Sequence, residues 1–198
     1  MKFIYIFVAI FNIISMTSQV NKTETAIFAG GCFWCTEAIF KDLKGVEHIA
    51  PGYIGGERKN PTYEQICSGA TGHAEAIKIV FYPDKISYEE LLQIFFATHD
   101  PTTLNRQGND IGTQYRSAIF YTSEHQNKMA KAYIAFLEKE DVYPNYIETE
   151  VVPATEFYEA EDYHHNYLKN NPDNSYCQFV IMPKLAKFRK NFKEKLKK

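Results

Sequence analysis

A short apolar segment of the chain ends at two glycines that stand directly before a cysteine. Residues 25–29 (TAIFA) are spaced like a strand, and Gly30 and Gly31 indicate the turn that ends it. In residues 32–44 the apolar positions recur closer to a helical period than to alternation. The thiol of Cys32 is therefore expected at a junction between a strand and a helix.

Strand-like and helix-like segments continue to alternate along the chain. Further strands are expected at residues 45–54, which Pro51-Gly52 should break, and at residues 73–81, 117–121 and 147–152. Helices should follow Ser87, which forms a capping box with Glu90, and Ser123. Partly alternating strands bury one face. The pattern predicts an α/β fold of the α+β kind: a two-layer sandwich whose mixed or antiparallel sheet is packed by helices. Residues 100–115 read as a polar loop without a packing period.

The N-terminal residues have the order of a signal peptide. Lys2 precedes twelve uncharged, mostly apolar residues, and residues 15–19 are mostly polar. The apolar run is short for a membrane-spanning helix, which needs about 20 residues. We expect residues 1–19 to be a cleaved signal peptide of an exported protein (periplasmic or secreted). A retained N-terminal membrane anchor is the alternative.

Charge and cysteine content exclude several classes of protein. The net charge of −2 argues against a nucleic-acid-binding protein. Four cysteines in 198 residues are too few for a disulfide scaffold. Basic residues gather in residues 184–198, which read as an amphipathic helix with its apolar side packed on the domain, or in contact with a membrane or an acidic partner. The expected division is therefore a catalytic domain over residues 24–183 and a basic tail over residues 184–198.

Cys32 is a candidate nucleophile. The unpaired N–H groups and partial positive charge of a helix start should stabilise its thiolate. Cys32 and Cys35 form a C-x-x-C pair, a spacing typical of redox sites and less specific for metal. Phe33 and Trp34 offer flat apolar surfaces beside the sulfur. The alternatives are a small buried cysteine and ordinary aromatic core packing.

Four sequence blocks carry a family resemblance. They are residues 30–34 (GGCFW, with Glu37 beyond them), 52–56 (GYIGG), 72–75 (GHAE) and 108–117 (GNDIGTQYRS). In this order they resemble the A-type peptide methionine sulfoxide reductases, and the resemblance extends from residue 26 to about residue 183. It implies a ferredoxin-like core and reduction of the S epimer of methionine sulfoxide, in proteins or free. It also implies a thioredoxin-like reductant, a monomer and no cofactor.

The resemblance implies a role for each matching residue. Cys32 would be the nucleophile, Phe33 and Trp34 would hold the substrate methyl group, Tyr53, Glu75 and Tyr115 would surround the sulfoxide oxygen, and Asp110 would support the pocket. The chemistry agrees, because a sulfoxide is a poor electrophile until its oxygen gains a proton. A carboxyl in an apolar pocket stays protonated near neutral pH, so Glu75 is the expected acid, with an exposed strand carboxylate as the alternative.

Attack would leave Cys32 as a sulfenic acid that condenses with a second thiol. Cys177 resembles the resolving cysteine of the family, and we favour it because pairing Cys32 with Cys35 would strain the helix. Cys35 remains the alternative, and Cys67 is expected to be structural. His73 and the His164-His165 pair suggest a metal site, but no third ligand at suitable spacing accompanies them, so we expect hydrogen-bonded or solvated histidines and no metal site.

Two other functions compete with this one. A general thiol–disulfide oxidoreductase would use Cys32 and Cys35 and ignore sulfoxides. A non-enzymatic module would bury its cysteines and use the basic tail as its interaction surface. Neither accounts for the three motifs that accompany the cysteine block.

Overall fold

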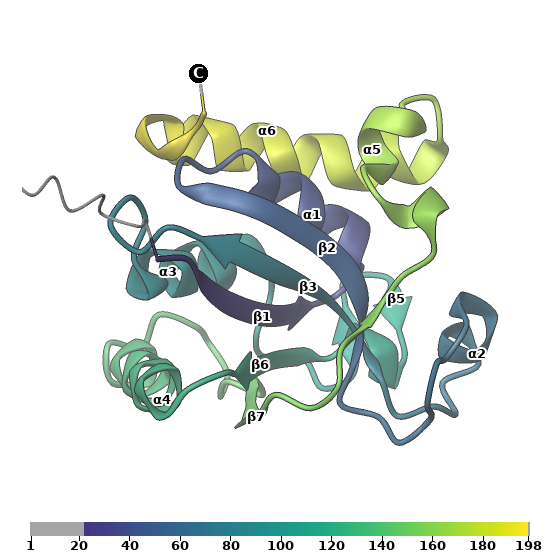
Figure 1. Ribbon diagram of the computed structural model, residues 1–198. Helices are drawn as coiled ribbons and strands as arrows, with labels where there is room; N and C mark the ends of the chain where they lie inside the picture. Colours follow the sequence, from purple (N-terminus) through teal and green to yellow (C-terminus); the bar gives the residue numbers. More distant parts are fainter. Residues whose placement is uncertain (1–21, 198) are drawn as a thin grey trace, which may run out of the picture.

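A six-stranded mixed sheet forms the centre of the molecule (Figure 1). The computed structural model describes residues 22–197, so the predicted signal peptide or anchor over residues 1–19 lies outside the described residues. The strands are β1 (Glu24–Gly30), β2 (Val46–Ile54), β3 (Ala74–Phe81), β6 (Ser117–Tyr121), β7 (Glu150–Pro153) and β8 (Tyr158–Glu159). They lie in the order β7-β6-β1-β3-β2-β8, and only β6 and β7 run parallel. The predicted fold class, a mixed sheet packed by helices, is confirmed.

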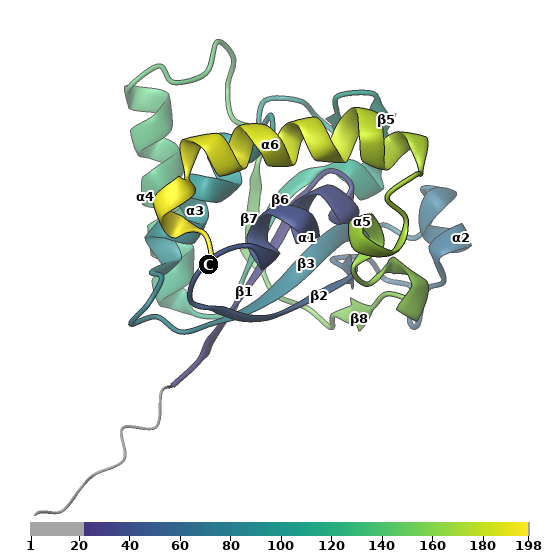
Figure 2. The ribbon, with the colours of Figure 1, turned by 90° about the horizontal axis from the view of Figure 1, so that it is seen from above.

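Helices cover one face of this sheet. The four longer ones are α1 (Phe33–Lys41), α3 (Tyr88–Thr98), α4 (Glu124–Lys139) and α6 (Met182–Asn191). Helices α1 and α3 pack on the strands, α4 packs against α3, and α6 crosses over α1 (Figure 2). Phe28 faces the helices from β1, whereas its neighbour Ile27 belongs to a smaller cluster on the opposite face. The larger core thus lies between the sheet and the helices, and Cys32 belongs to it.

Strand β2 runs without a break through Pro51, so the predicted interruption is wrong. Pro51 pairs with Ile77 of β3, and its carbonyl accepts a 2.9 Å hydrogen bond from Ala160 N, just beyond β8. Proline has no N–H to donate. At Pro51 an N–H would point toward β8, the short strand at the edge of the sheet, so no hydrogen bond to β3 is lost. The strand therefore tolerates the proline.

The segment predicted as a plain loop over residues 100–115 has regular structure. It contains a small hairpin, β4 (Arg106–Gln107) with β5 (Asp110–Ile111), followed by the 3-10 helix η1 (Thr113–Tyr115). The Gln107 side chain joins it to the end of α3, because its amide accepts from Asp100 N at 3.1 Å and donates to Asp100 O at 3.0 Å. Side-chain bonds of this kind have no periodic signature in a sequence.

The basic C-terminal segment is helical only in part. Helix α6 ends at Asn191, the 3-10 helix η4 (Lys193–Lys195) follows, and Leu196 then forms a bridge with Leu43 after α1. The prediction of one helix over residues 184–198 is therefore wrong, because the last residues pair with the chain after α1. Leu185 and Phe188 are buried, so the apolar side of α6 packs on the domain. Within residues 22–197, no helix is long and apolar enough to cross a membrane.

Candidate active site

Cys32 lies where the sequence predicted, between strand β1 and helix α1. Gly31 has φ +86°, a left-handed conformation that glycine adopts without strain. A Cβ atom there would approach Cγ of Gln107 to 2.5 Å, so the turn also needs the absence of a side chain. Cys32 then caps α1, and its carbonyl accepts a 3.1 Å hydrogen bond from Cys35 N.

The thiols of Cys32 and Cys35 are both buried and hydrogen-bonded to each other. Burial raises the pKa of Cys32 well above its ordinary value, and Cys35 and Glu75 add to that effect. The hydrogen bond from Cys32 lowers the pKa of Cys35 to about 7, against the opposing effect of burial and with help from the charge of Lys184. The expectation that the helix start favours a Cys32 thiolate is therefore wrong for the free protein, because burial outweighs it.

Glu75 is a buried carboxyl next to this pair. It lies near the start of β3 with 1% of its surface exposed, and Oε2 accepts a 3.0 Å hydrogen bond from Phe33 N. Burial raises its pKa to about 8, and the charge of Asp110 adds to the shift against the opposing hydrogen bond. The exposed-carboxylate alternative is wrong, and Glu75 is largely protonated at neutral pH.

Two tyrosines from different elements flank Glu75. Tyr53 stands opposite Glu75 in the register of β2 and β3 and is fully buried. Tyr115 projects from η1 and is partly exposed. Burial raises the pKa of both hydroxyls, and the charge of Glu75 raises them further. Both side chains therefore remain hydrogen-bond donors.

A cavity of about 270 Å³ opens beside the thiols. Its lining includes Cys32, Cys35 and Asp110. The Tyr176 hydroxyl donates a 2.6 Å hydrogen bond to Asp110 Oδ2 and lies 3.9 Å from Cys35 Sγ. Sequence reasoning had included Asp110 but missed Tyr176, which reaches the cavity from a C-terminal segment without periodicity.

The two other cysteines occupy contrasting positions. Cys177 is the first residue of the π-helix η3 (Cys177–Ile181) and is fully buried. Burial raises the pKa of its thiol, and the charge of Cys35 adds to this. Cys67 is exposed at the end of the short helix α2 (Tyr63–Cys67), outside the core.

Phe33 and Trp34 form an aromatic wall. The Phe33 ring is buried, and its centroid lies 5.8 Å from that of Tyr53. Trp34 is partly exposed and stacks on Tyr167 with centroids 3.6 Å apart and planes within 3°. Its indole N–H donates a 3.0 Å hydrogen bond to His164 Nδ1. The wall is thus held in position from the C-terminal part of the chain.

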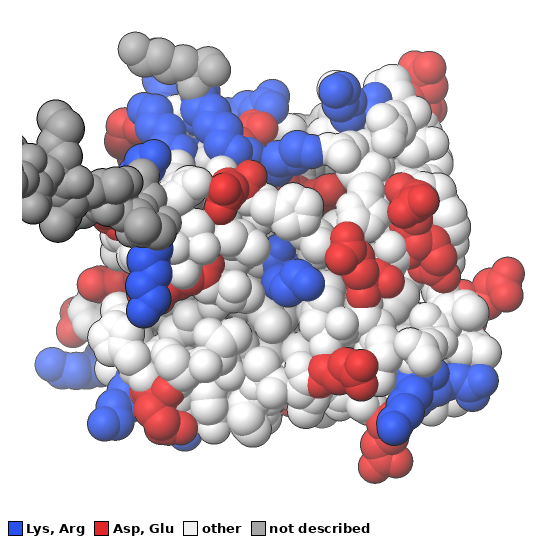
Figure 3. Space-filling view, viewed as in Figure 1, with Lys and Arg blue, Asp and Glu red and all other residues white. Residues whose placement is uncertain are grey.

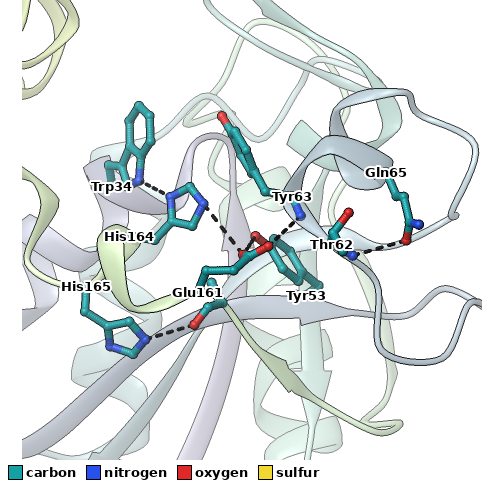
Figure 4. Close-up of polar contacts among 9 residues, drawn as sticks. Trp34, Tyr53, Thr62, Tyr63, Gln65, Glu161, His164 and His165 are labelled. Atoms are coloured by element: carbon teal, nitrogen blue, oxygen red, sulfur yellow. Dashed lines mark hydrogen bonds and ion pairs between the residues drawn. The ribbon is translucent and has the colours of Figure 1, made fainter.

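A polar network behind the wall was missed by the sequence analysis (Figure 4). Glu161 accepts 2.8 Å hydrogen bonds from the Tyr53 hydroxyl and from Tyr63 N. Partial burial opposes ionisation of Glu161, but these hydrogen bonds lower its pKa. His164 Nε2 lies 3.8 Å from Glu161, and burial lowers the pKa of His164 to about 4. The side chains of this network converge from distant segments, and the sequence indicated for His164 only a hydrogen-bonded or solvated histidine.

The histidines considered as metal ligands bond to protein groups instead. His73 accepts from Gly56 N at 3.0 Å through Nδ1, and its Nε2 lies 2.7 Å from Arg58 O. His165 Nε2 lies 3.2 Å from Ala160 O. In the part of the chain that the structure describes, no group of three or more His, Cys, Asp or Glu side chains could hold a metal ion.

The sequence matches a known family along almost its whole described length. The model of that family, "Peptide methionine sulfoxide reductase", matches residues 24–196. A relative from Deinococcus radiodurans, named "Peptide methionine sulfoxide reductase MsrA", is 54% identical over 191 residues, 92% of this chain and 93% of its own. The chain belongs to the peptide methionine sulfoxide reductase family. As a methionine sulfoxide reductase it is an oxidoreductase, which removes the case for a non-enzymatic module.

Solved structures of methionine sulfoxide reductases share the fold. Reduced Mxr1 from Saccharomyces cerevisiae superposes with a TM-score of 0.71 at 36% identity, covering 79% of this chain and 90% of that one. Mxr1 in complex with Trx2 matches with a TM-score of 0.51 at 26% identity, covering 77% and 90%. The sheet and the helix that carry Cys32 and Glu75 thus belong to the fold of this reductase family.

Proposed function

We propose that the protein reduces the S epimer of methionine sulfoxide, in proteins or free, with Cys32 as nucleophile and Glu75 as proton donor. One observation carries this proposal: a buried carboxyl, whose pKa burial raises to about 8, accepts a hydrogen bond from the backbone of the residue that follows the cysteine. Such a carboxyl can protonate the sulfoxide oxygen while the neighbouring sulfur attacks. The A-type motifs support the S epimer.

The proton transfers balance without a cofactor. Glu75 donates its proton to the sulfoxide oxygen as Cys32 Sγ bonds to the substrate sulfur, and the thiol proton of Cys32 passes to the Glu75 carboxylate. The hydroxyl then moves to Cys32, which becomes a sulfenic acid, and methionine leaves with a two-electron gain. Because the thiol proton moves during attack, the raised pKa of Cys32 in the free protein does not block the reaction. Phe33 and Trp34 would hold the substrate methyl group.

Hydroxyl donors and Asp110 would complete the pocket. Tyr53 and Tyr115 stay protonated and can donate to the sulfoxide oxygen without adding charge. For Tyr53 this requires exchange of its present bond to Glu161. Asp110 would support the pocket through the Tyr176 hydroxyl.

We propose that Cys35 resolves the sulfenic acid first and that Cys177 then acts on Cys35. Cys35 lies three residues from Cys32 and lines the same cavity, which puts its thiol within reach of the sulfenic acid. Cys32 has ψ 125° and stands outside the helix, so a bond to Cys35 strains α1 less than the sequence suggested. Condensation releases water and forms the Cys32–Cys35 disulfide. Attack by Cys177 would then form a Cys35–Cys177 disulfide and return the Cys32 thiol, whereas the sequence favoured Cys177 as the thiol that resolves the sulfenic acid directly.

The electrons for turnover would come from a thioredoxin-like donor. The complex of Mxr1 with Trx2 supports this assignment.

We further propose that the protein acts as a monomer and is exported after cleavage near residue 19. Sequencing the N-terminus of the exported protein tests cleavage, since retention of Met1 would instead indicate an N-terminal anchor.

Single-turnover reduction of both epimers of a methionine sulfoxide peptide tests the mechanism. We expect reduction of the S epimer alone and no reaction in Cys32→Ser. Cys35→Ser should accumulate Cys32 sulfenic acid, which dimedone labels, whereas Cys177→Ser should stop at the Cys32–Cys35 disulfide. A stall of Cys177→Ser at the sulfenic acid would make Cys177 the direct resolving thiol. Disulfide exchange without sulfoxide reduction would favour the general thiol–disulfide oxidoreductase.

A further inference from the structure

Three large apolar side chains stand exposed between the buried Cys177 and the first turn of α6. Phe179, Val180 and Met182 expose 79%, 40% and 49% of their surface. They follow the buried Cys177 on η3 and at the start of α6, and Val180 lines the cavity that contains Cys32. Neighbouring exposed apolar side chains of this size are typical of a surface that another molecule covers.

Two lysines, Lys184 and Lys187, follow these residues along α6. Lys184 and Lys187 follow Val180 at helical spacing and so share its face of the helix. Lys184 lines both the thiol cavity and an adjoining hollow of about 260 Å³, and Lys187 lines that hollow, as does Asp100. In the described ranges neither lysine forms an ion pair, whereas Arg189 on the same helix pairs with Asp42. Figure 3 shows Lys and Arg side chains gathered over α6.

We propose that Phe179, Val180 and Met182, together with Lys184 and Lys187, form the docking surface for the protein reductant. The inference rests on the proposed function, in which an enzyme disulfide must be reduced after each turnover. A protein thiol that reduces it has to approach the cavity that Val180 and Lys184 line, and Phe179, Met182 and Lys187 each lie within three residues of one of these two. The partner that fits is a dithiol protein with an apolar surface around its reactive cysteine and acidic residues on the flank that meets α6.

The reduction itself follows from thiol–disulfide exchange. The reductant's thiolate attacks one sulfur of the enzyme disulfide, forms a mixed disulfide and releases the other sulfur as a thiol. The second thiol of the reductant then displaces the enzyme. The enzyme gains two electrons and two protons, and the reductant leaves as a disulfide.

A lipid surface fits these observations less well. A helix that lies on a membrane needs an apolar face along its length. The apolar positions Leu185 and Phe188 of α6 are buried against the domain, so the exposed side of the helix beyond Met182 is mostly polar. Phe179, Val180 and Met182 stand before α6 or at its first residue, and this end of the helix lies beside β5 in Figure 2. This position favours a partner that acts on the thiols.

Turnover with two reductants tests the surface. The full chain, with free S-epimer methionine sulfoxide, would be driven either by a bacterial thioredoxin with its NADPH-dependent reductase or by dithiothreitol. We expect Phe179→Ser to raise the KM for thioredoxin about tenfold, as loss of an apolar anchor does. Lys187→Glu should raise it about threefold at low salt and lose that effect at about 0.5 M salt. Turnover with dithiothreitol should not change.

Lys131→Glu on α4 is the matched control, because it makes the same charge change at an exposed position of another helix. It should leave the KM for thioredoxin unaltered. An unchanged KM in both Phe179→Ser and Lys187→Glu would overturn the docking surface. So would binding to phosphatidylglycerol vesicles that Phe179→Ser abolishes while the KM for thioredoxin stays the same. Failure of the unmodified enzyme with dithiothreitol would instead refute the proposed function.

Discussion

The backbone N–H of Phe33 donates a 3.0 Å hydrogen bond to Oε2 of Glu75, which lies 42 residues further along the chain. Phe33 is the first residue of α1, so this bond pairs one of the N–H groups that a helix start leaves unsatisfied. A neutral carboxyl accepts through its carbonyl oxygen, which puts the acidic proton on Oε1. The bond thus fixes both the position of the acid and the oxygen that can donate to a substrate.

Replacing Glu75 with glutamine should slow sulfoxide reduction by about 10²- to 10⁴-fold, the usual contribution of a general acid. Glutamine keeps an acceptor for Phe33 N, so the site should stay folded, but it has no acidic proton to give to the sulfoxide oxygen. Glu37→Gln is the control, because Glu37 is also a buried carboxyl with a pKa raised by burial but bonds to Asn166 N. Single-turnover rates of sulfoxide reduction would compare the Glu75→Gln and Glu37→Gln variants with the unmodified protein. An unchanged rate in Glu75→Gln would show that Glu75 is not the acid.

The pH dependence of the first step should follow the ionisation of Glu75. The pKa of about 8 keeps the carboxyl protonated below that pH, so the rate should fall as pH rises through about 8. Glu75→Gln should lack this fall. Single-turnover rates of the unmodified protein between pH 6 and 9.5 provide the profile. A rate that rises across this range would mean that thiol ionisation, and not the carboxyl, limits attack.

Glu75 should also make the protein less stable as pH rises. The unfolded chain releases this proton near pH 4.5 and the folded chain near pH 8, so the folded state binds more protons between these values. Stability is therefore lost from about pH 4.5 up to about pH 8, and at pH 7 the loss amounts to about 3 kcal/mol. Glu75→Gln should raise the free energy of unfolding at pH 7 but not at pH 4.5. Urea denaturation at the two pH values measures the difference, and equal effects at both would contradict it.

The elements that position Cys32 could be predicted because each has a local signature. The two glycines before Cys32 give the turn at the end of β1, and the capping box of Ser87 and Glu90 at the start of α3 is present, with bonds of 3.1 and 2.8 Å. The burial of Glu75 was expected from the role that the family resemblance implies, because its local sequence also fitted an exposed strand carboxylate. Local backbone geometry and one-sided burial are properties that a sequence carries directly.

The rest of the site depends on contacts between distant segments. Tyr53 and Glu161 are 108 residues apart, and Trp34 and His164 are 130 apart. No spacing in the sequence brings Glu161 behind the aromatic wall or Tyr176 over Cys35. The pKa of Cys32 was misjudged for a related reason: the helix start is visible in the sequence, whereas the depth of burial is a property of the packed fold.

Gly31→Ala should destabilise the fold more than the same change at Gly69. Both glycines have positive φ, +86° and +74°, so alanine adds about 1 kcal/mol of backbone strain at either position. Only at Gly31 does the new Cβ meet a neighbour, Gln107 at 2.5 Å, which adds about 1–2 kcal/mol. Urea denaturation measures both losses. Equal losses would show that Gln107 moves aside freely and does not support the Cys32 turn.

The fluorescence of Trp34 should report the protonation of His164. Trp34 is the only tryptophan in the chain, and its indole N–H donates to His164 Nδ1. Burial lowers the pKa of His164 to about 4, so the ring stays neutral until the pH falls to that value. Protonation then removes the acceptor on Nδ1 and puts a quenching imidazolium against the indole, and we expect the emission to fall with a midpoint near pH 4.

His164→Phe should abolish the transition, whereas His165→Asn, one residue away, should keep it. Far-UV circular dichroism over the same range separates this change from acid unfolding, and a midpoint near 6.5 would mean that His164 is open to solvent and does not hold Trp34 in place.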